Sequence, residues 1–272
     1  MSKACLEEFI EFGEILAETA AGPIRQYFQD PEAAPVQRKP DGSCYTLADK
    51  EGEVVMREAI RARYPGHGIV GEEFAPENES AEFVWVLDPV DGTNGFVTAS
   101  PMFTTAIALR QGDVPILGII NSPILGWRWI GARGRPTTRD GREVRTRPCA
   151  ALADATLCCA SPAYLRPADH DAFFEFTQAV GTVGYGSYTH AGGFVAQGLV
   201  DLLVEGTVSP HDYLAHLPIV EGAGGIVTNW EGDALGGYPV ERLLVAGDPK
   251  LHELAVAHLA NSGGGPDGPT AG

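Results

Sequence analysis

The spacing of hydrophobic residues along the first half of the chain changes from a helical period to a strand period. Residues 6–28 carry apolar side chains at helical spacing, beginning with Leu6, Phe9 and Ile10, which predicts an amphipathic helix. Thr46 is a suitable N-cap for a second helix that continues to about residue 64. Shorter apolar or alternating runs predict strands, so we expect two helices packed on an antiparallel sheet. The predicted strands cover residues 69–71, 83–87, 104–110, 114–121 and 127–132.

The second half alternates strand-like and helix-like segments, which is typical of an α/β layer. We expect residues 1–140 to form an α+β half, residues 141–260 an α/β half, and residues 261–272, rich in Gly and Pro, a disordered tail. Residues 134–153 are basic and weakly patterned and are interpreted as the crossover between the halves. The predicted strands are 155–160, 201–205, 225–228 and 243–247, and the predicted helices are 169–179, 190–197, 213–223 and 249–259.

Composition narrows the class of protein. The chain has 272 residues, of which 44% are hydrophobic, enough for one large domain or two joined halves. No apolar run is long enough to span a bilayer, and acids stand where a signal peptide has its apolar core, so we expect a soluble, cytoplasmic protein. The five cysteines form no CxxC spacing, which argues against a disulfide scaffold or a zinc site. A net charge of −17 argues against nucleic acid and anionic membranes as partners.

The most informative stretch is residues 83–94. An apolar run ends on Asp88, Pro89 follows, and then Asp91 and the pair Gly92–Thr93 complete a turn. Two acids at the end of a buried strand can hold a divalent metal, and the N–H groups of the Gly–Thr pair can bind an anion. The alternative is an acidic turn without further function. On these residues alone, both interpretations stay open.

Further acids stand at the ends of predicted elements, namely Asp49, Glu72 and Asp212. Each has an alternative: Asp49 as a helix-start charge, Glu72 as part of a solvated corner, Asp212 as an N-cap. If they converge with Asp88 and Asp91, their repulsion requires cations. An oxygen-only ligand set suits Mg²⁺, which would support phosphoryl transfer to water and would let an acidic protein bind an anion.

Taken in order, these motifs resemble the inositol monophosphatase family of Mg²⁺-dependent, lithium-sensitive phosphatases. The resemblance spans nearly the whole chain, and its most specific part is Leu-Asp-Pro-Val-Asp-Gly-Thr at residues 87–93. It implies the layered αβαβα sugar-phosphatase fold, with an antiparallel first half and an alternating α/β second half, and a homodimer. The matching pieces are residues 41–43 with Thr46 and Asp49, residues 71–73, residues 85–93, and residues 211–212 with 221–225.

The resemblance also implies a role for each matching residue. Glu72, Asp88 and the Val90 carbonyl would bind one Mg²⁺; Asp88, Asp91 and Asp212 a second; and Glu72, with Asp49 through water, a weaker third. Thr93, paired with Asp49 or Glu72, would orient the attacking water, while the N–H groups of Gly92 and Thr93 would hold the phosphate. Glu205 stands at the family's position for binding a hydroxyl or an amine of the substrate. The full set of candidate substrate-binding residues is Asp91, Asn94, Ser187, Tyr188, Glu205 and His211.

The substrate is a small-molecule phosphate ester whose identity the sequence leaves open. The C-terminal motif is most similar to the histidinol-phosphate phosphatase branch, but His211 matches neither the Tyr of that branch nor the Trp of the inositol branch. Tyr188 stands where that branch has an acid, and Asn94 also departs from its pattern. These changes indicate either a different leaving group or packing variants. Arg38 and Lys39 are interpreted as solvated loop residues or as phosphate contacts.

The candidate substrates are therefore histidinol phosphate, an inositol, cyclitol or sugar phosphate, and a nucleotide phosphate. A catalytically silent member of the family is the remaining alternative. The absence of an extra basic cluster in the motifs argues against a bisphosphate substrate.

Overall fold

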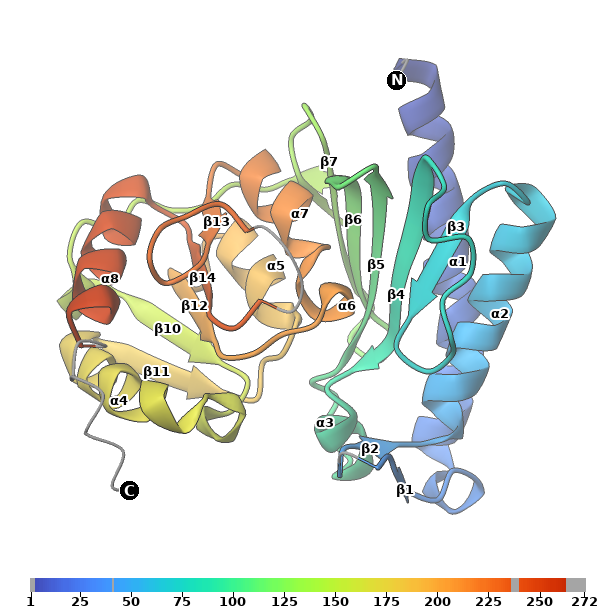
Figure 1. Cartoon of the computed structure of the whole chain (residues 1–272), viewed down its shortest axis with the longest axis horizontal. Coiled ribbons are helices and arrows are strands. Elements are labelled where there is room, and N and C mark those ends of the chain that lie inside the picture. Colours follow the sequence, from blue (N-terminus) through green and yellow to red (C-terminus); the bar gives the residue numbers. More distant parts are fainter. Residues whose placement is uncertain (1–2, 41, 236–239, 263–272) are drawn as a thin grey trace, which may run out of the picture.

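The chain folds as successive layers of helix, sheet, helix, sheet and helix (Figure 1). The computed structural model describes residues 3–40, 42–235 and 240–262. The layered αβαβα fold expected from the sequence is confirmed. Asp41 of the first motif and residues 263–272 of the expected tail lie outside the described residues, and helix α8 (Pro249–Ser262) takes up the first two positions of that tail.

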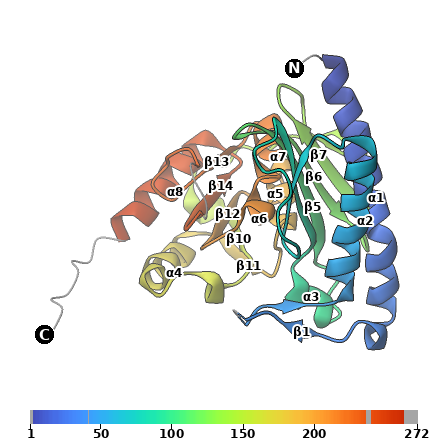
Figure 2. The ribbon, with the colours of Figure 1, turned by 45° about the vertical axis from the view of Figure 1, so that its right-hand side comes forward.

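Helices α1 (Lys3–Gln29) and α2 (Leu47–Arg63) form the first layer and pack against one face of the larger sheet (Figure 2). As predicted, Thr46 caps α2: its Oγ1 accepts the N–H of Ala48 at 3.1 Å. Asp49 in turn accepts the N–H of Thr46 at 2.7 Å, which completes a capping box. This local chemistry fixes the position of Asp49 at the start of α2.

The larger sheet has, among the described residues, the strand order β3-β4-β5-β6-β7-β8-β9. It is antiparallel except for β3, which runs parallel to β4, so the prediction of a wholly antiparallel sheet was wrong at this edge. Strand β4 also continues beyond residue 87, because Asp88 still pairs with β5 before a bulge shifts the register. The strands are β3 (Gly68–Gly71), β4 (Phe83–Asp91), β5 (Thr104–Gln111), β6 (Val114–Ser122), β7 (Trp127–Ala132), β8 (Thr138–Arg139) and β9 (Arg142–Glu143). A separate short hairpin joins β1 (Gln37–Arg38) to β2 (Cys44–Tyr45).

The second half contributes a helical layer, a mixed sheet and an outer helical layer. The described strands of this sheet have the order β11-β10-β12-β14-β13, with β10 parallel to both of its neighbours. Three predictions were wrong here: β11 was missed, the helix expected over residues 213–223 is divided, and the crossover contains the hairpin β8–β9. The strands are β10 (Thr156–Cys159), β11 (Thr182–Tyr185), β12 (Leu202–Glu205), β13 (Ile226–Thr228) and β14 (Leu243–Ala246). The helices are α3 (Thr93–Val97), α4 (His170–Ala179), α5 (His190–Ala196), α6 (Pro210–Tyr213) and α7 (His216–Gly222), with single 3₁₀ turns η1 (Pro31–Ala33), η2 (Leu152–Asp154), η3 (Pro162–Tyr164) and η4 (Pro167–Asp169).

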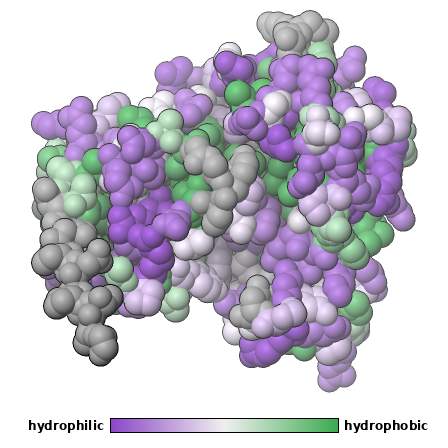
Figure 3. All heavy atoms as spheres, viewed as in Figure 1, coloured by the Kyte–Doolittle hydropathy of each residue, from purple (hydrophilic) through white to green (hydrophobic). Residues whose placement is uncertain are grey.

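Apolar side chains fill the spaces between the layers. One buried cluster lies between α1, α2 and the larger sheet, a second between the two sheets, and a third beneath α4 and α8. On the face shown in Figure 3, hydrophilic residues predominate and hydrophobic ones show in smaller groups. No helix among the described residues is both long and apolar enough to cross a membrane.

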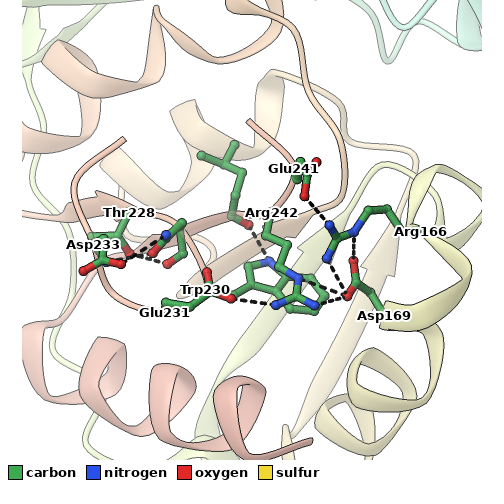
Figure 4. A network of polar contacts seen from close by, with 10 residues as sticks. Arg166, Asp169, Thr228, Trp230, Glu231, Asp233, Glu241 and Arg242 are labelled. Atoms are coloured by element: carbon green, nitrogen blue, oxygen red, sulfur yellow. Dashed lines mark hydrogen bonds and ion pairs between the residues drawn. The ribbon is translucent and has the colours of Figure 1, made fainter. Parts of the chain in front are cut away.

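A polar network joins the turn η4, just before α4, to Arg242, the residue before strand β14 (Figure 4). Buried Asp169 accepts hydrogen bonds from Arg166 Nε at 2.7 Å and from Arg242 Nε at 3.0 Å. Burial alone would raise the pKa of Asp169, but the bonds from Arg166 and Arg242 outweigh it and lower that pKa. The chain beside this anchor pairs Val240 with Val208 in an isolated bridge. The network therefore fixes the segment that leads into α6.

Candidate active site

The turn after β4 connects the two carboxylates Asp88 and Asp91 to the start of helix α3. Asp88 is buried, and its Oδ1 accepts the N–H of Val90 at 3.0 Å. Gly92 then adopts a left-handed conformation with φ of 92°, and α3 begins at Thr93. A side chain at Gly92 would be both strained and obstructed, because an added Cβ would lie 2.7 Å from the ring of Tyr188. The turn thus presents two carboxylates and the first N–H groups of α3 to the same side.

The predicted acids come together from four separate segments. One oxygen each of Asp88, Asp91 and Asp212 lie within 4.8 Å of one another. A second group within the same distance joins Glu72, Asp88 and a ring nitrogen of His211. Helix α6, which carries His211 and Asp212, packs against β4 (Figure 1). Asp88 belongs to both groups, so the two groups are adjacent parts of one centre.

Asp49 reaches this centre from α2 through Thr93. Thr93 Oγ1 lies 3.1 Å from Asp49 Oδ1 and 3.1 Å from the carbonyl oxygen of Val90, and its hydroxyl can donate to either. Asp49 is fully buried by the capping box described above. The Thr93 hydroxyl therefore donates its hydrogen bond to one of these two acceptors, which leaves a lone pair of its oxygen free to accept a hydrogen bond.

Burial and mutual repulsion perturb the acids of the centre. Burial, followed by the charge of Asp212, raises the pKa of Asp91 to about 7. Burial raises the pKa of Asp212 to about 7 as well, and it raises that of Asp49 to about 6. Asp88 has a pKa well above its ordinary value, because it is buried and faces Glu72. Uncompensated carboxylates at such short separations favour a cation between them.

Lys39 supplies one cation at the edge of the centre. Its Nζ lies 2.8 Å from Glu72 Oε1 and 2.6 Å from Glu73 Oε1. Burial would lower the pKa of Lys39, but the hydrogen bonds to Glu72 and Glu73 raise it instead. Of the two sequence interpretations of Lys39, a solvated loop residue or a phosphate contact, the structure shows neither: Lys39 contacts carboxylates. The sequence signal for this role was the position of Lys39 beside Arg38 in a basic turn.

Two supports of the centre were missed in the sequence. The backbone N–H of Thr189 donates to Asp91 Oδ2 at 2.5 Å, and the Thr189 hydroxyl donates to the same oxygen. Buried Glu53 accepts the N–H of Glu73 at 2.8 Å and pairs with Arg57 at 2.7 Å. The first contact fixes Asp91, and the second holds the loop that carries Glu72.

A cavity of about 670 Å³ opens beside the acids and extends between the two sheets. Glu205 lies in it, is buried, accepts the N–H of Ala160 at 2.6 Å, and has a pKa raised to about 8 by burial. Tyr164, which the sequence interpretation did not name, also lines the cavity, and its hydroxyl accepts a hydrogen bond from Asn94.

Of the predicted substrate residues, Asp91, Asn94, Tyr188, Glu205 and His211 line the cavity. Ser187 is not among the lining residues. It is buried, and its hydroxyl lies 3.6 Å from Cys158 Sγ, because the chain turns it toward β10. Ser187 is thus next to Tyr188 along the chain, but its side chain does not line the cavity.

Comparison with known proteins now adds to this geometry. The sequence profile of the inositol monophosphatase family matches residues 5–263. The chain belongs to the inositol monophosphatase family. The chloroplastic bifunctional phosphatase IMPL2 of Arabidopsis thaliana is 37% identical over 268 residues, covering 95% of this chain and 77% of that protein. The histidinol-phosphatase of Mycobacterium tuberculosis is 34% identical, covering 82% of this chain and 87% of that protein.

Solved structures agree with the family assignment. An inositol monophosphatase from Zymomonas mobilis matches with a TM-score of 0.84 at 33% identity, covering 96% of this chain and all of that one (100%). The chain is accordingly a phosphatase of this family, a phosphoric monoester hydrolase. Its acidic centre consists of residue groups that could bind metal ions.

Proposed function

We propose that this chain is a Mg²⁺-dependent phosphomonoesterase that hydrolyses a small polar phosphate ester to its alcohol and phosphate. The observation that carries the proposal is the convergence of Asp88, Asp91 and Asp212 within 4.8 Å. The raised pKa values of the three acids and the burial of Asp88 make a cation-free, fully ionised centre unfavourable at neutral pH. An oxygen donor set of this kind fits Mg²⁺.

The residues present fit two to three ions. Glu72, Asp88 and the carbonyl of Val90 would hold one; Asp88, Asp91 and Asp212 would hold a second; and Glu72, with Asp49 through water, would hold a third. The Val90 carbonyl already faces the centre, because it lies 3.1 Å from Thr93 Oγ1. When bound, such ions make a water more acidic and stabilise charge on the leaving oxygen.

The protein's own groups then position the reaction. Thr93 Oγ1, with its proton directed to Asp49, accepts a hydrogen bond from the attacking water and so orients that water. The N–H groups of Gly92 and Thr93 donate to the phosphate oxygens at the start of α3. Thr189 keeps Asp91 in place throughout, through its N–H and its hydroxyl. Together these contacts fix the ester relative to the water, which lowers the entropic part of the barrier.

The leaving alcohol occupies the remainder of the cavity, beside Glu205, Tyr188 and His211. Histidinol phosphate is the first candidate substrate, because the relative from Mycobacterium tuberculosis is named a histidinol-phosphatase. An inositol, cyclitol or sugar phosphate is the next. Glu205 would accept a hydrogen bond from a hydroxyl or an amine of the leaving alcohol.

A specific observation favours a second candidate, a nucleotide or another ring-bearing phosphate. Tyr188 has a φ of 45°, an uncommon conformation for a bulky residue, and its ring lies against Gly92. Burial raises the pKa of Tyr188 to about 12, so the phenol stays neutral. With Tyr164, it gives the cavity two phenol walls on which a flat ring can stack. A Tyr188→Ala variant should then lose about tenfold in kcat/KM for a nucleoside monophosphate, and little for glycerol 2-phosphate.

A phosphate-release screen tests the proposal. Histidinol phosphate, inositol 1-phosphate, sugar phosphates and nucleoside monophosphates are assayed with Mg²⁺ and with excess chelator. At least one ester should release phosphate only with Mg²⁺, and Asp91→Asn should lower kcat by 10²-fold or more. The matched control is Asp113→Asn, because the Asp113 side chain is fully exposed (100%) in the β5–β6 turn. Full activity in excess chelator would contradict the metal-dependent mechanism.

Three further expectations stay proposals. We propose a homodimer, a cytoplasmic location, and a division into halves at residues 1–140 and 141–260. Light scattering after size-exclusion chromatography measures the first, since a mass near 28.8 kDa indicates a monomer and about twice that value a dimer.

A further inference from the structure

His211 is placed differently from His216, the other histidine that lines the cavity among the described residues. It lies in α6, one residue before Asp212, and lines the cavity, with 17% of its side chain exposed. A ring nitrogen of His211, one Glu72 oxygen and one Asp88 oxygen lie within 4.8 Å of one another. The three side chains come from α6, from the loop after β3 and from β4, so their meeting is a product of the tertiary fold.

The imidazole is not already satisfied by its neighbour. Its Nε2 lies 3.5 Å from Asp212 Oδ1, which is longer than a usual N–H···O hydrogen bond of about 2.9 Å. His216, one turn further along, differs: it is 2% exposed and packs so closely on Gly192 that an added Cβ would lie 1.9 Å from its Nδ1. His211 thus faces carboxylates and open cavity, whereas His216 is part of the core.

The distances suit one ion. Ligand atoms that bind a single divalent ion at about 2.1 Å lie about 3 Å apart when adjacent and about 4.2 Å apart when opposite. The ligand atoms of Glu72, Asp88 and His211 lie within 4.8 Å of one another. Small side-chain rotations would bring them to the separations that a single ion requires. Two carboxylate oxygens and one imidazole nitrogen form a mixed donor set, which divalent transition ions favour over Mg²⁺.

We propose that His211 is a nitrogen ligand of the ion held by Glu72 and Asp88, so that this position binds a divalent transition ion more tightly than Mg²⁺. The inference rests on the proposed metal-dependent function, and it adds a ligand and a metal preference to one position of that centre. The position that Asp91 and Asp212 share with Asp88 keeps oxygen ligands alone. The two positions therefore differ in the ions that they select.

Co²⁺ titration followed by calorimetry and visible absorption tests the proposal. Imidazole nitrogen is a stronger-field ligand than water, so the Co²⁺ bands of the wild-type protein should lie at shorter wavelength than those of His211→Phe. Co²⁺ affinity should fall at least tenfold in His211→Phe, a loss already seen when partners outside the ligand shell are removed. Mg²⁺ affinity should change less than threefold, because Mg²⁺ gains little from an imidazole.

His211→Gln carries the same test with a polar side chain, in case the phenylalanine variant does not fold. His258→Phe on α8 is the matched control, because it removes an imidazole on the far side of the smaller sheet. Unchanged Co²⁺ affinity and spectrum in the His211 variants would overturn the proposal, and so would wild-type bands at the wavelengths of oxygen-only Co²⁺. A protein that binds neither Mg²⁺ nor Co²⁺ in any form instead refutes the proposed function as a whole.

Discussion

The buried ion pair Glu53–Arg57 should contribute to the free energy of unfolding and help to position Glu72. The two side chains are 0% and 3% exposed, and Arg57 Nε lies 2.7 Å from Glu53 Oε1. The remaining Arg57 nitrogens donate to Glu77 Oε1 at 2.7 Å and to the carbonyl of Phe74 at 3.1 Å. Arg57→Met removes the charge, keeps most of the volume, and leaves Glu53 as an unpaired charge in the core.

The expected cost follows from this burial. Removing one partner of a buried, hydrogen-bonded ion pair costs about 3–5 kcal/mol. The unfolding entropy near 60 °C is about 2.1 cal/mol/K per residue, or about 0.6 kcal/mol/K for a chain of 272 residues. Arg57→Met should therefore lower Tm by about 5–9 °C. The double variant Glu53→Gln with Arg57→Met should regain part of this loss, because no charge is then left buried.

The same change should weaken metal binding. Glu53 Oε2 accepts the N–H of Glu73 at 2.8 Å, and Arg57 both orients Glu53 and donates to the carbonyl of Phe74, so losing Arg57 should loosen the loop that carries Glu72. The Mg²⁺ concentration that gives half-maximal phosphate release should rise in Arg57→Met, while kcat at saturating Mg²⁺ changes less.

Differential scanning calorimetry with and without Mg²⁺ measures the stability effect. Arg61→Met is the matched control: Arg61 lies one turn further along α2, contacts the same Glu77, and is 54% exposed. An exposed pair contributes about 0–1 kcal/mol, so this variant should lose at most about 2 °C. If the Tm of Arg57→Met falls no further than that of Arg61→Met, the buried pair does not stabilise the fold.

Other predictions concern the acids and their supports. Thr189→Val removes the hydroxyl that donates to Asp91 and should lower kcat about tenfold with little change in Tm, measured by steady-state phosphate release. Burial raises the pKa of Asp91 from its ordinary 3.8 to about 7 in the folded, metal-free protein. The protonated carboxyl therefore contributes its full stabilisation below pH 3.8, and this stabilisation is lost as the pH rises through 7. Tm without metal should therefore fall between pH 5 and 8, and Mg²⁺ should raise Tm more at pH 8; equal Mg²⁺ shifts at both pH values would contradict this. Gly71→Ala places a Cβ 2.0 Å from Glu53 Oε1 and should cost about 1–3 kcal/mol in thermal unfolding, whereas Gly66→Ala, with nothing within 4 Å, should be close to neutral.

Local hydrophobic patterns predicted most of the helices and strands, and each wrong prediction has a cause in the residues nearby. Strand β11 (Thr182–Tyr185) was missed because it is four residues long, contains Gly184, and pairs on one side only. The helix predicted over residues 213–223 divides because Pro218 has no N–H to continue the bonding of α6 into α7. The first error omits an edge strand and the second misplaces a helix boundary, and neither changes the order of the layers.

The acids of the centre could be predicted from the sequence, whereas the residues that support them could not. Asp88 and Asp91 share one short motif, and a strand followed by a tight turn brings both to the same sheet edge. Thr189, in contrast, lies 98 residues from the carboxylate that it holds, and nothing in its neighbours along the chain indicates that partner. Arg57 is similar: its sequence position fits an ordinary exposed helical residue, and only the loop folded over it makes it buried.

Tyr188 shows why the substrate could not be predicted from the motifs. A left-handed φ costs a bulky residue about 1–2 kcal/mol, and the sequence does not reveal which residue carries it. This conformation allows the Tyr188 ring to lie against Gly92 while the next residue, Thr189, donates to Asp91. The wall of the leaving-group cavity and the support of a carboxylate in the acidic centre are therefore neighbours on one strained segment. The groups that donate to Asp91 belong to Thr189, so a substitution at position 188 that keeps the left-handed backbone should alter the cavity wall and leave Asp91 in place.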